Sequence, residues 1–125
     1  MSADTAAASF RSGQIVVADW RGDALSKEPN KLRPAVVVED DGLFAPGFPH
    51  VLLVPLTEDA GLAKPDLSVA IEPTEENGCP SPCWAISCFV TSTSKLRVRP
   101  TPSHITQEQL AAIRRQIALA IGAIA

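Results

Sequence analysis

The stretch KLRPAVVVEDD, residues 31–41, places an arginine directly before the proline and the apolar residues of a candidate core strand. The guanidinium of Arg33 is planar and always charged, so it can stabilise negative charge on phosphoryl oxygens better than a lysine. Taken by itself, an arginine at the start of a strand is most often a solvated flank. Thr57 has the same two interpretations, because its hydroxyl can donate to a ligand or bond its own turn.

The other side chains that could take part in a reaction or bind a metal form no recognisable site in the sequence. Cys79, Cys83 and Cys88 leave one thiol unpaired in any disulfide scheme, so free thiols are the simpler interpretation. The spacing of Cys79 and Cys83 differs from the C-x2-C of zinc ribbons, and the histidines lie far away in sequence. Acid pairs such as Glu58 and Asp59 lie in polar turns without a third ligand. We therefore predict no metal site, and the cysteines receive no role.

The composition is that of one globular domain. With 125 residues, 46% of them hydrophobic, the chain can build one core and is too apolar to be disordered. Its formal net charge of -3 does not attract nucleic acid or an anionic membrane, so a polyanion would need a local basic patch. No apolar run approaches the roughly 20 residues of a membrane span, and the first residues do not resemble a secretory signal. We expect a cytoplasmic protein with no membrane partner.

Hydrophobic patterning predicts a chain built mostly from strands. We expect a flexible leader over residues 1–10 and a single domain over residues 11–125. The predicted strands span residues 13–20, 35–39, 51–57, 66–72, 83–92 and 95–99. Pro55 is expected to interrupt the third of these, while Pro100 and Pro102 should end the last one. The continuous apolar run of the second strand predicts burial on both of its faces.

One helix is predicted over residues 107–121. Thr106 and Gln109 form a capping box, Glu108 lies in the first turn, and Gly122 is a natural stop. Five apolar residues at helical spacing should face the sheet, namely Leu110, Ile113, Ile117, Ala120 and Ile121. Arg114 and Arg115 are expected to face water. Short strands, long loops and a terminal helix together indicate a small, strongly bent antiparallel barrel.

The order of these pieces resembles the MazF/PemK family of toxin endoribonucleases along residues 13 to about 122. The resemblance rests on G-x-I-V-x-x-D/W at Gly13–Trp20, R-P-A-V-V-V at Arg33–Val38, V-P-L-T at Val54–Thr57 and the helix QEQLAAIRRQIALAIG. It implies a mostly β, SH3-like antiparallel barrel with a C-terminal helix. It also implies a homodimer that cleaves single-stranded RNA without a metal or other cofactor. A cognate antitoxin would occupy the RNA groove.

The same resemblance suggests which residues carry the reaction. In metal-free cleavage, the ribose 2′-hydroxyl attacks the adjacent phosphorus, and the protein stabilises the added negative charge. Arg33 corresponds to the arginine that would bind this phosphate, and Thr57 to the threonine that would hydrogen-bond it. Glu28 lies five residues before Arg33, where some members carry a glutamate associated with activity. It is the candidate for proton transfer or for holding Arg33.

The resemblance also leaves RNA binding and one alternative open. Arg21 and Lys31 are candidate RNA contacts, and Phe89 is a candidate for stacking on a base, although a core position suits it too. Many family members carry a polar D-Q-x-R-T-x-D-like run where this chain has CWAISCFVTS. A catalytically degenerate binding protein, or a gyrase poison of the CcdB type, is therefore the alternative. The chain ends IGAIA without a tryptophan, which argues against gyrase.

Overall fold

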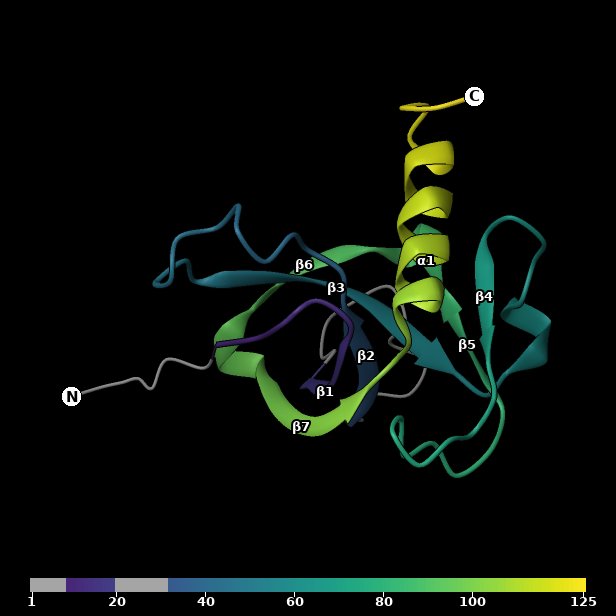
Figure 1. The fold of residues 1–125 in the computed structure, drawn as a ribbon, viewed down its shortest axis with the longest axis horizontal. Coiled ribbons are helices and arrows are strands. Elements are labelled where there is room, and N and C mark those ends of the chain that lie inside the picture. Colours follow the sequence, from purple (N-terminus) through teal and green to yellow (C-terminus); the bar gives the residue numbers. More distant parts are fainter. Residues whose placement is uncertain (1–8, 20–31) are drawn as a thin grey trace.

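The computed structural model of the chain describes residues 9–19 and 32–125, which form an antiparallel sheet and one C-terminal helix (Figure 1). The strands are β1 (Gln14–Asp19), β2 (Leu32–Val37), β3 (His50–Thr57), β4 (Ser68–Ile71), β5 (Cys83–Ile86), β6 (Thr91–Ser94) and β7 (Val98–His104). Three 3-10 helices, η1 (Ala60–Leu62), η2 (Ser87–Phe89) and η3 (Lys95–Arg97), connect them, and α1 (Gln107–Ala120) follows. The predicted fold class, mostly β with a terminal helix, is confirmed.

Every strand pairing in the described chain is antiparallel. The strands follow the order β4-β5-β3-β2-β1-β7, and β6 pairs with β3 beside β5. This path has free ends at β4 and β7, so the described strands form a bent antiparallel sheet that is not closed edge to edge. Of the predicted leader, Phe10 packs partly against the core, and residues 1–8 lie outside the described residues.

The core has two apolar clusters, one on each side of β2. Val36 and Val38 belong to the cluster covered by α1, whereas Ala35 and Val37 belong to the other. All four residues are buried, which confirms the prediction that this run is buried on both faces. Because each of these side chains is enclosed by packed neighbours, this part of the chain is held in a fixed position. Arg33 stands two residues before this anchored segment.

The third strand runs without interruption through Pro55, contrary to the prediction. On one side β3 pairs with β6 over residues 50–53 and with β5 at Leu56 and Thr57. Pro55 falls in the gap between these two partners, where the missing N–H of a proline breaks no ladder bond. The strand thus passes from one part of the sheet to the other, and Thr57 ends it.

Two other strand predictions were wrong in their boundaries. The predicted strand 83–92 consists of β5 and β6 separated by η2, since the backbone turns at Ser87, whose N–H donates to the Leu67 oxygen. The predicted strand 95–99 begins as η3 and continues as β7 through Pro100 and Pro102. Within the described sheet, β7 pairs only with β1, and an edge strand tolerates proline because one side needs no ladder bonds.

The helix prediction is confirmed. Helix α1 begins after Thr106, whose hydroxyl accepts from the Gln109 N–H while the Gln109 side chain accepts from the Thr106 N–H. Leu110 and Ile113 are buried in the core, as their spacing predicted. The helix ends at Ala120, one residue before the predicted end.

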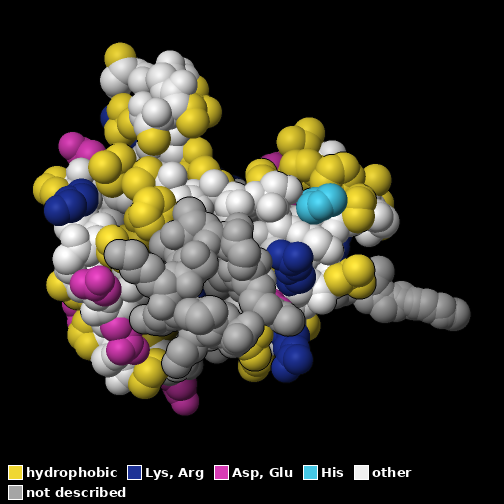
Figure 2. All heavy atoms as spheres, turned by 180° about the vertical axis from the view of Figure 1, so that it is seen from behind, with side chains coloured by type: hydrophobic (Ala, Val, Ile, Leu, Met, Phe, Trp, Pro, Cys, Tyr) yellow, Lys and Arg dark blue, Asp and Glu magenta, His cyan; other side chains and the backbone are white. Residues whose placement is uncertain are grey.

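Beyond its first turns the helix projects from the sheet (Figure 1), so the prediction that Ala120 and Ile121 face the sheet is wrong. Both residues are exposed, Ile121 by 72%, and hydrophobic side chains are visible at this projecting end in Figure 2. The prediction for Arg114 is also wrong. Arg114 does not face water, because it donates to the backbone oxygens of Val38 and Glu39 and to the hydroxyl of Ser12. It therefore ties α1 to the end of β2. Among the described residues, no helix is long and apolar enough to cross a membrane.

Candidate active site

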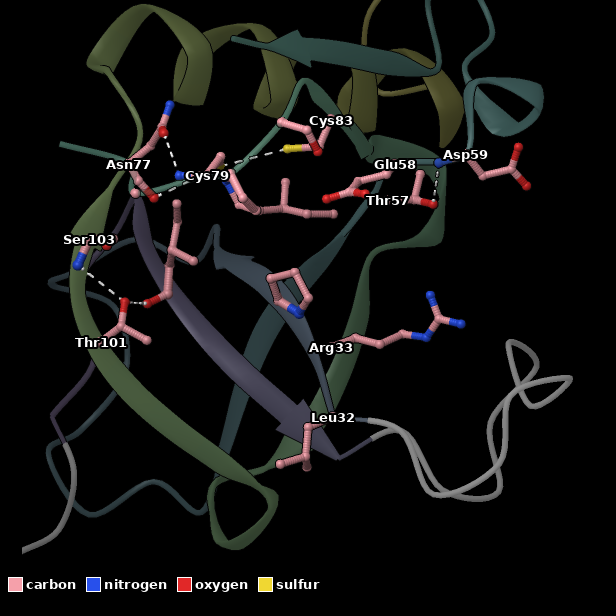
Figure 3. A pocket seen from close by; sticks show the side chains of 16 residues that line it. Leu32, Arg33, Thr57, Glu58, Asp59, Asn77, Cys79, Cys83, Thr101 and Ser103 are labelled. Carbon is pink, nitrogen blue, oxygen red and sulfur yellow. Dashed lines mark hydrogen bonds between the residues drawn. The ribbon is translucent and has the colours of Figure 1, made fainter. Parts of the chain in front are cut away.

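A cavity of about 540 Å³ opens where β2 begins and β3 ends (Figure 3). Its lining comes from six parts of the chain: β1, the start of β2, the end of β3 with the following turn, the loop over residues 72–82, the start of β5, and β7. The residues that concern chemistry are Arg33, Thr57, Glu58, Asn77, Cys79 and Cys83. The cavity therefore combines a cation, a hydroxyl, a carboxylate and two thiols.

Arg33 and Thr57, the two leading candidates from the sequence, lie at this cavity. The last β2–β3 pair joins Ala35 to Pro55. Extending that antiparallel register by two residues brings Arg33 and Thr57 to matching positions on the two strands. Both side chains line the cavity, and Figure 3 shows them on the side away from Asn77. A phosphate in this cavity would have the guanidinium and the hydroxyl within the same site.

The Thr57 hydroxyl also bonds its own turn, which was the other role considered for it from the sequence. Its Oγ1 accepts a hydrogen bond from the Asp59 N–H at 3.0 Å, which closes the turn after β3. This bond uses a lone pair of the oxygen, so the O–H proton is still available as a donor. The turn thereby fixes the hydroxyl, and the same group can donate to a ligand.

Glu58 is a cavity residue that the sequence reasoning missed. It was grouped with Asp59 as a solvated pair, yet the two side chains differ in the structure. Asp59 Oδ1 accepts from the Gly61 N–H at 2.8 Å and caps η1. Both acids are exposed and line the cavity, but Figure 3 shows only the Glu58 side chain extending into it. No local signal in the sequence separates these two acids, because the turn geometry decides which one points inward.

The far wall of the cavity is a loop organised by Asn77, which is only 4% exposed. Its Oδ1 accepts from the backbone N–H groups of Thr74 and Cys79, and its Nδ2 donates to the Glu72 oxygen. A buried amide satisfied in this way holds the loop in one conformation. The backbone of Cys79 is thereby fixed at the cavity.

Two cysteines meet in this wall, which the sequence did not predict. The Cys83 thiol lies 3.8 Å from the sulfur of Cys79 and donates to it. Burial, the neighbouring Cys79 and, more weakly, the Glu58 carboxylate raise the pKa of Cys83 to about 12. Cys83 is therefore a protonated thiol at neutral pH. Cys88 is exposed in η2 and is not part of this cavity.

The remaining predicted site residues lie elsewhere. Glu28, Arg21 and Lys31 fall outside the described residues. Phe89 is in η2, is 38% exposed and does not line this cavity. A base stacked on Phe89 would therefore lie outside the cavity that Arg33 lines. Within residues 9–19 and 32–125, no three His, Cys, Asp or Glu side chains gather closely enough to hold a metal ion.

The fold is that of MazF toxins. The chain is similar to MazF from Deinococcus radiodurans, with a TM-score of 0.71, 17% identity and coverage of 92% of this chain and 98% of that one. It is also similar to a mycobacterial endoribonuclease in complex with its cognate antitoxin, with a TM-score of 0.69, 17% identity and coverage of 91% and 96%. A third similar structure is the Mycobacterium tuberculosis toxin MazF-mt6, with a TM-score of 0.65, 16% identity and coverage of 87% and 96%.

The sequence also matches a protein family. Residues 11–121 match the family described as PemK-like, MazF-like toxin of type II toxin–antitoxin system, and the chain belongs to it. A search of curated protein sequences gives no match. The resemblance stated from the motifs is thereby confirmed.

Proposed function

We propose that this protein is an endoribonuclease that cleaves single-stranded RNA without a metal ion, as the toxin of a type II toxin–antitoxin system. The observation that carries the proposal is the cavity shared by Arg33 and Thr57 in a chain of the MazF/PemK family. A guanidinium and a hydroxyl donor are the groups that a phosphate needs when it gains negative charge in a transition state. The family match supports the toxin assignment.

In this mechanism the 2′-hydroxyl of the RNA attacks the adjacent phosphorus. The P–O2′ bond forms, the P–O5′ bond breaks and O5′ takes a proton from solvent, which leaves a cyclic phosphate and a free 5′-hydroxyl. Arg33 donates to the non-bridging oxygens as their charge increases, and Thr57 donates its O–H proton to the same group. The anchored β2 strand and the Thr57–Asp59 turn hold both donors in place before the substrate arrives.

The reaction also requires a group that accepts the 2′-hydroxyl proton. Glu58 is the carboxylate whose side chain extends into the cavity, and we assign it this role (Figure 3). Glu28, which was predicted from the family pattern, is the competing candidate. A substitution of each glutamate by glutamine separates the two assignments.

The proposed partners are a second copy of the chain and a cognate antitoxin in the cytoplasm. A mycobacterial relative of the same fold is known in complex with its antitoxin, and so is MazF of Deinococcus radiodurans with MazE. Several large apolar side chains are exposed here, including Leu96 at 97% and Leu43 at 73%. Exposed apolar groups of this size support protein interfaces. An antitoxin segment that occupied the cavity would block Arg33.

The decisive experiment incubates the purified chain with a mixed-sequence RNA in the presence of EDTA. We expect endonucleolytic fragments that end in a cyclic phosphate or its hydrolysis product. An Arg33→Ala variant with the same circular dichroism spectrum should give none. If the folded protein cuts no RNA, the enzymatic proposal is wrong.

One observation favours a binding protein on the same fold. Ile86 and Ser87 stand where many family members have a polar run, and both are buried, with the Ser87 hydroxyl bonded to Gln116 Oε1 at 2.6 Å. These positions therefore supply no group to an RNA groove. Growth arrest on expression, with cellular RNA left intact, would support this second candidate.

A further inference from the structure

The Cys79–Cys83 pair is the strongest feature of the cavity that RNA cleavage does not use. The two sulfur atoms are 3.8 Å apart and both residues line the cavity (Figure 3). Cys79 is half-buried in the 72–82 loop, whereas Cys83 is 6% exposed at the first position of β5. In a disulfide bond the sulfurs are about 2.0 Å apart, so the two sulfur atoms need to move only slightly closer to form one.

The backbone on each side of the sulfur contact is held in place. The Asn77 side chain accepts from the Cys79 N–H at 2.9 Å, and Asn77 itself is buried. Cys83 lies within the core cluster, so β5 fixes the second sulfur. Because both backbones are held, the thiols meet in the folded protein and do not depend on an encounter of flexible segments.

The two thiols differ in their accessibility and in the groups that they contact. Cys83 donates its S–H to the sulfur of Cys79, whose own S–H donates to the Asn77 backbone oxygen at 3.8 Å. Cys79 is the more accessible of the two, so a small oxidant in the cavity meets it first. Burial raises the pKa of Cys83 to about 12, which keeps this thiol protonated until the second step.

We propose that Cys79 and Cys83 form a reversible intrachain disulfide in the folded protein, and that this bond lowers RNA cleavage. The oxidant is a small-molecule disulfide such as oxidised glutathione. The Cys79 thiolate attacks one of its sulfurs, which forms a mixed disulfide and expels a thiolate. This first thiolate takes up the proton that Cys79 lost to solvent. Cys83 then attacks the Cys79 sulfur, expels the second thiolate and gives its own proton to it, which releases the second thiol. Two protein thiols are oxidised while one disulfide is reduced to two thiols.

The bond would change the cavity because it shortens the sulfur contact. Closing 3.8 Å to about 2.0 Å pulls the loop that carries Asn77 and Cys79 towards β5. Cys83 also precedes Trp84, which pairs with Thr57 in the β3–β5 register. A shift of about 1 Å in an active site can cost about a hundredfold in rate. This effect on cleavage rests on the proposed function, whereas formation of the disulfide does not.

The first test measures the bond itself. The reference is the full chain with Cys88→Ser, which removes the exposed thiol outside the cavity. After incubation with oxidised glutathione, free thiols are alkylated and peptides are mapped without reduction. We expect a Cys79–Cys83 cross-link that dithiothreitol reverses. If both cysteines stay alkylatable or carry separate glutathione adducts in protein with a native circular dichroism spectrum, the proposal is wrong.

The second test measures RNA cleavage in both redox states. Oxidation should slow the Cys88→Ser protein at least about tenfold, and reduction should restore its rate. The rate of a Cys79→Ser/Cys88→Ser variant, which leaves the buried Cys83 in place, should not respond to the oxidant. A disulfide that forms without changing cleavage would refute the regulatory half. If no RNA is cut in either state, the proposed function fails, while the peptide map still decides whether the disulfide exists.

Discussion

Arg33 and Thr57 occupy matching positions on adjacent antiparallel strands, two residues beyond the last β2–β3 pair at Ala35 and Pro55. The pairing between β2 and β3 ends at that pair, and the cavity opens beside Arg33 and Thr57. Each residue is anchored by a different device: Arg33 by the buried segment that follows it, and Thr57 by the bond from the Asp59 N–H. A cation and a hydroxyl are therefore placed together without depending on flexible segments.

The first prediction concerns the geometry of the Arg33 side chain. Arg33→Lys keeps the charge but loses the planar set of donors, so we expect cleavage to fall roughly a hundredfold. The melting temperature should stay within a few degrees of wild type, because Arg33 is at the rim of the fold. Single-turnover cleavage of a short RNA and a thermal melt measure the two effects. Full activity in the lysine variant would exclude a role that needs the guanidinium.

The second prediction separates the two roles of Thr57. Thr57→Val removes the hydroxyl and keeps the shape, so cleavage should fall about tenfold to a hundredfold. Thr57→Ser keeps the hydroxyl and should retain most of the activity. The bond from Asp59 is exposed, so water can replace it and the stability loss should stay near 1 kcal/mol. Equal cleavage rates for the serine and valine variants would show that the hydroxyl serves only the turn.

The third prediction identifies the proton acceptor. Glu58→Gln preserves size and polarity but cannot accept a proton, so cleavage should fall and lose its dependence on acid pH. Glu28→Gln is the matched comparison. The pH–rate profiles of the two variants give the answer, because only the true base changes the shape of the curve. A flattened profile for Glu28→Gln alone would move the role to Glu28.

A fourth prediction concerns stability at low pH. Hydrogen bonds from the Ser12 backbone N–H and the Ser12 hydroxyl hold the pKa of Asp41 below its usual value of 3.8. A carboxyl whose pKa is lowered in the folded state stabilises it above the unfolded pKa and loses this effect as the pH falls. Asp41→Asn should therefore lower the melting temperature at pH 7, and the difference from wild type should shrink below pH 3.8.

The control for Asp41 removes the same charge elsewhere. Glu75→Gln changes an exposed acid of the 72–82 loop and should shift the melting temperature less. Thermal melts of the three proteins between pH 2 and pH 7 make the comparison. A gap between wild type and Asp41→Asn that does not depend on pH would contradict the assignment of the effect to ionised Asp41.

The features that the sequence predicted correctly are those with local signals. The capping box at Thr106 and Gln109 lies within one helical turn, and the run after Pro34 is apolar at every position, which indicates burial on two faces. Arg33 and Thr57 were found because each is next to a strand segment with a recognisable motif. In the structure, the pairing of β2 with β3 brings both residues to one cavity. Their catalytic roles are still predictions.

The features that the sequence missed depend on contacts between distant segments. Arg114 looks like a solvated helix residue, yet the end of β2 brings the backbone oxygens of Val38 and Glu39 within its reach. The apolar run from Cys83 hides the turn at Ser87, whose position is set by the Leu67 oxygen. These partners lie tens of residues away, so no pattern in a short window could reveal them.

The fifth prediction tests the wall that carries Cys79. Gly78 has a φ of +63°, and a Cβ atom there would lie 2.9 Å from the Ser103 hydroxyl oxygen on β7. Gly78→Ala therefore combines a left-handed backbone, which costs about 1–2 kcal/mol, with a steric overlap. We expect a lower melting temperature and weaker RNA cleavage, since the loop must shift. Thermal melts and cleavage assays on the same preparations measure both effects.

The steric part and the backbone part of this cost can be separated. Ser103→Ala removes the overlapping oxygen, so the Gly78→Ala/Ser103→Ala protein should recover the steric loss and keep the backbone loss. Gly47→Ala is the control, because a Cβ at that position meets no atom within 4 Å. Additive effects in the double variant would show that Gly78 and Ser103 do not touch. Coupling between them would instead establish that the cavity wall is packed directly on β7.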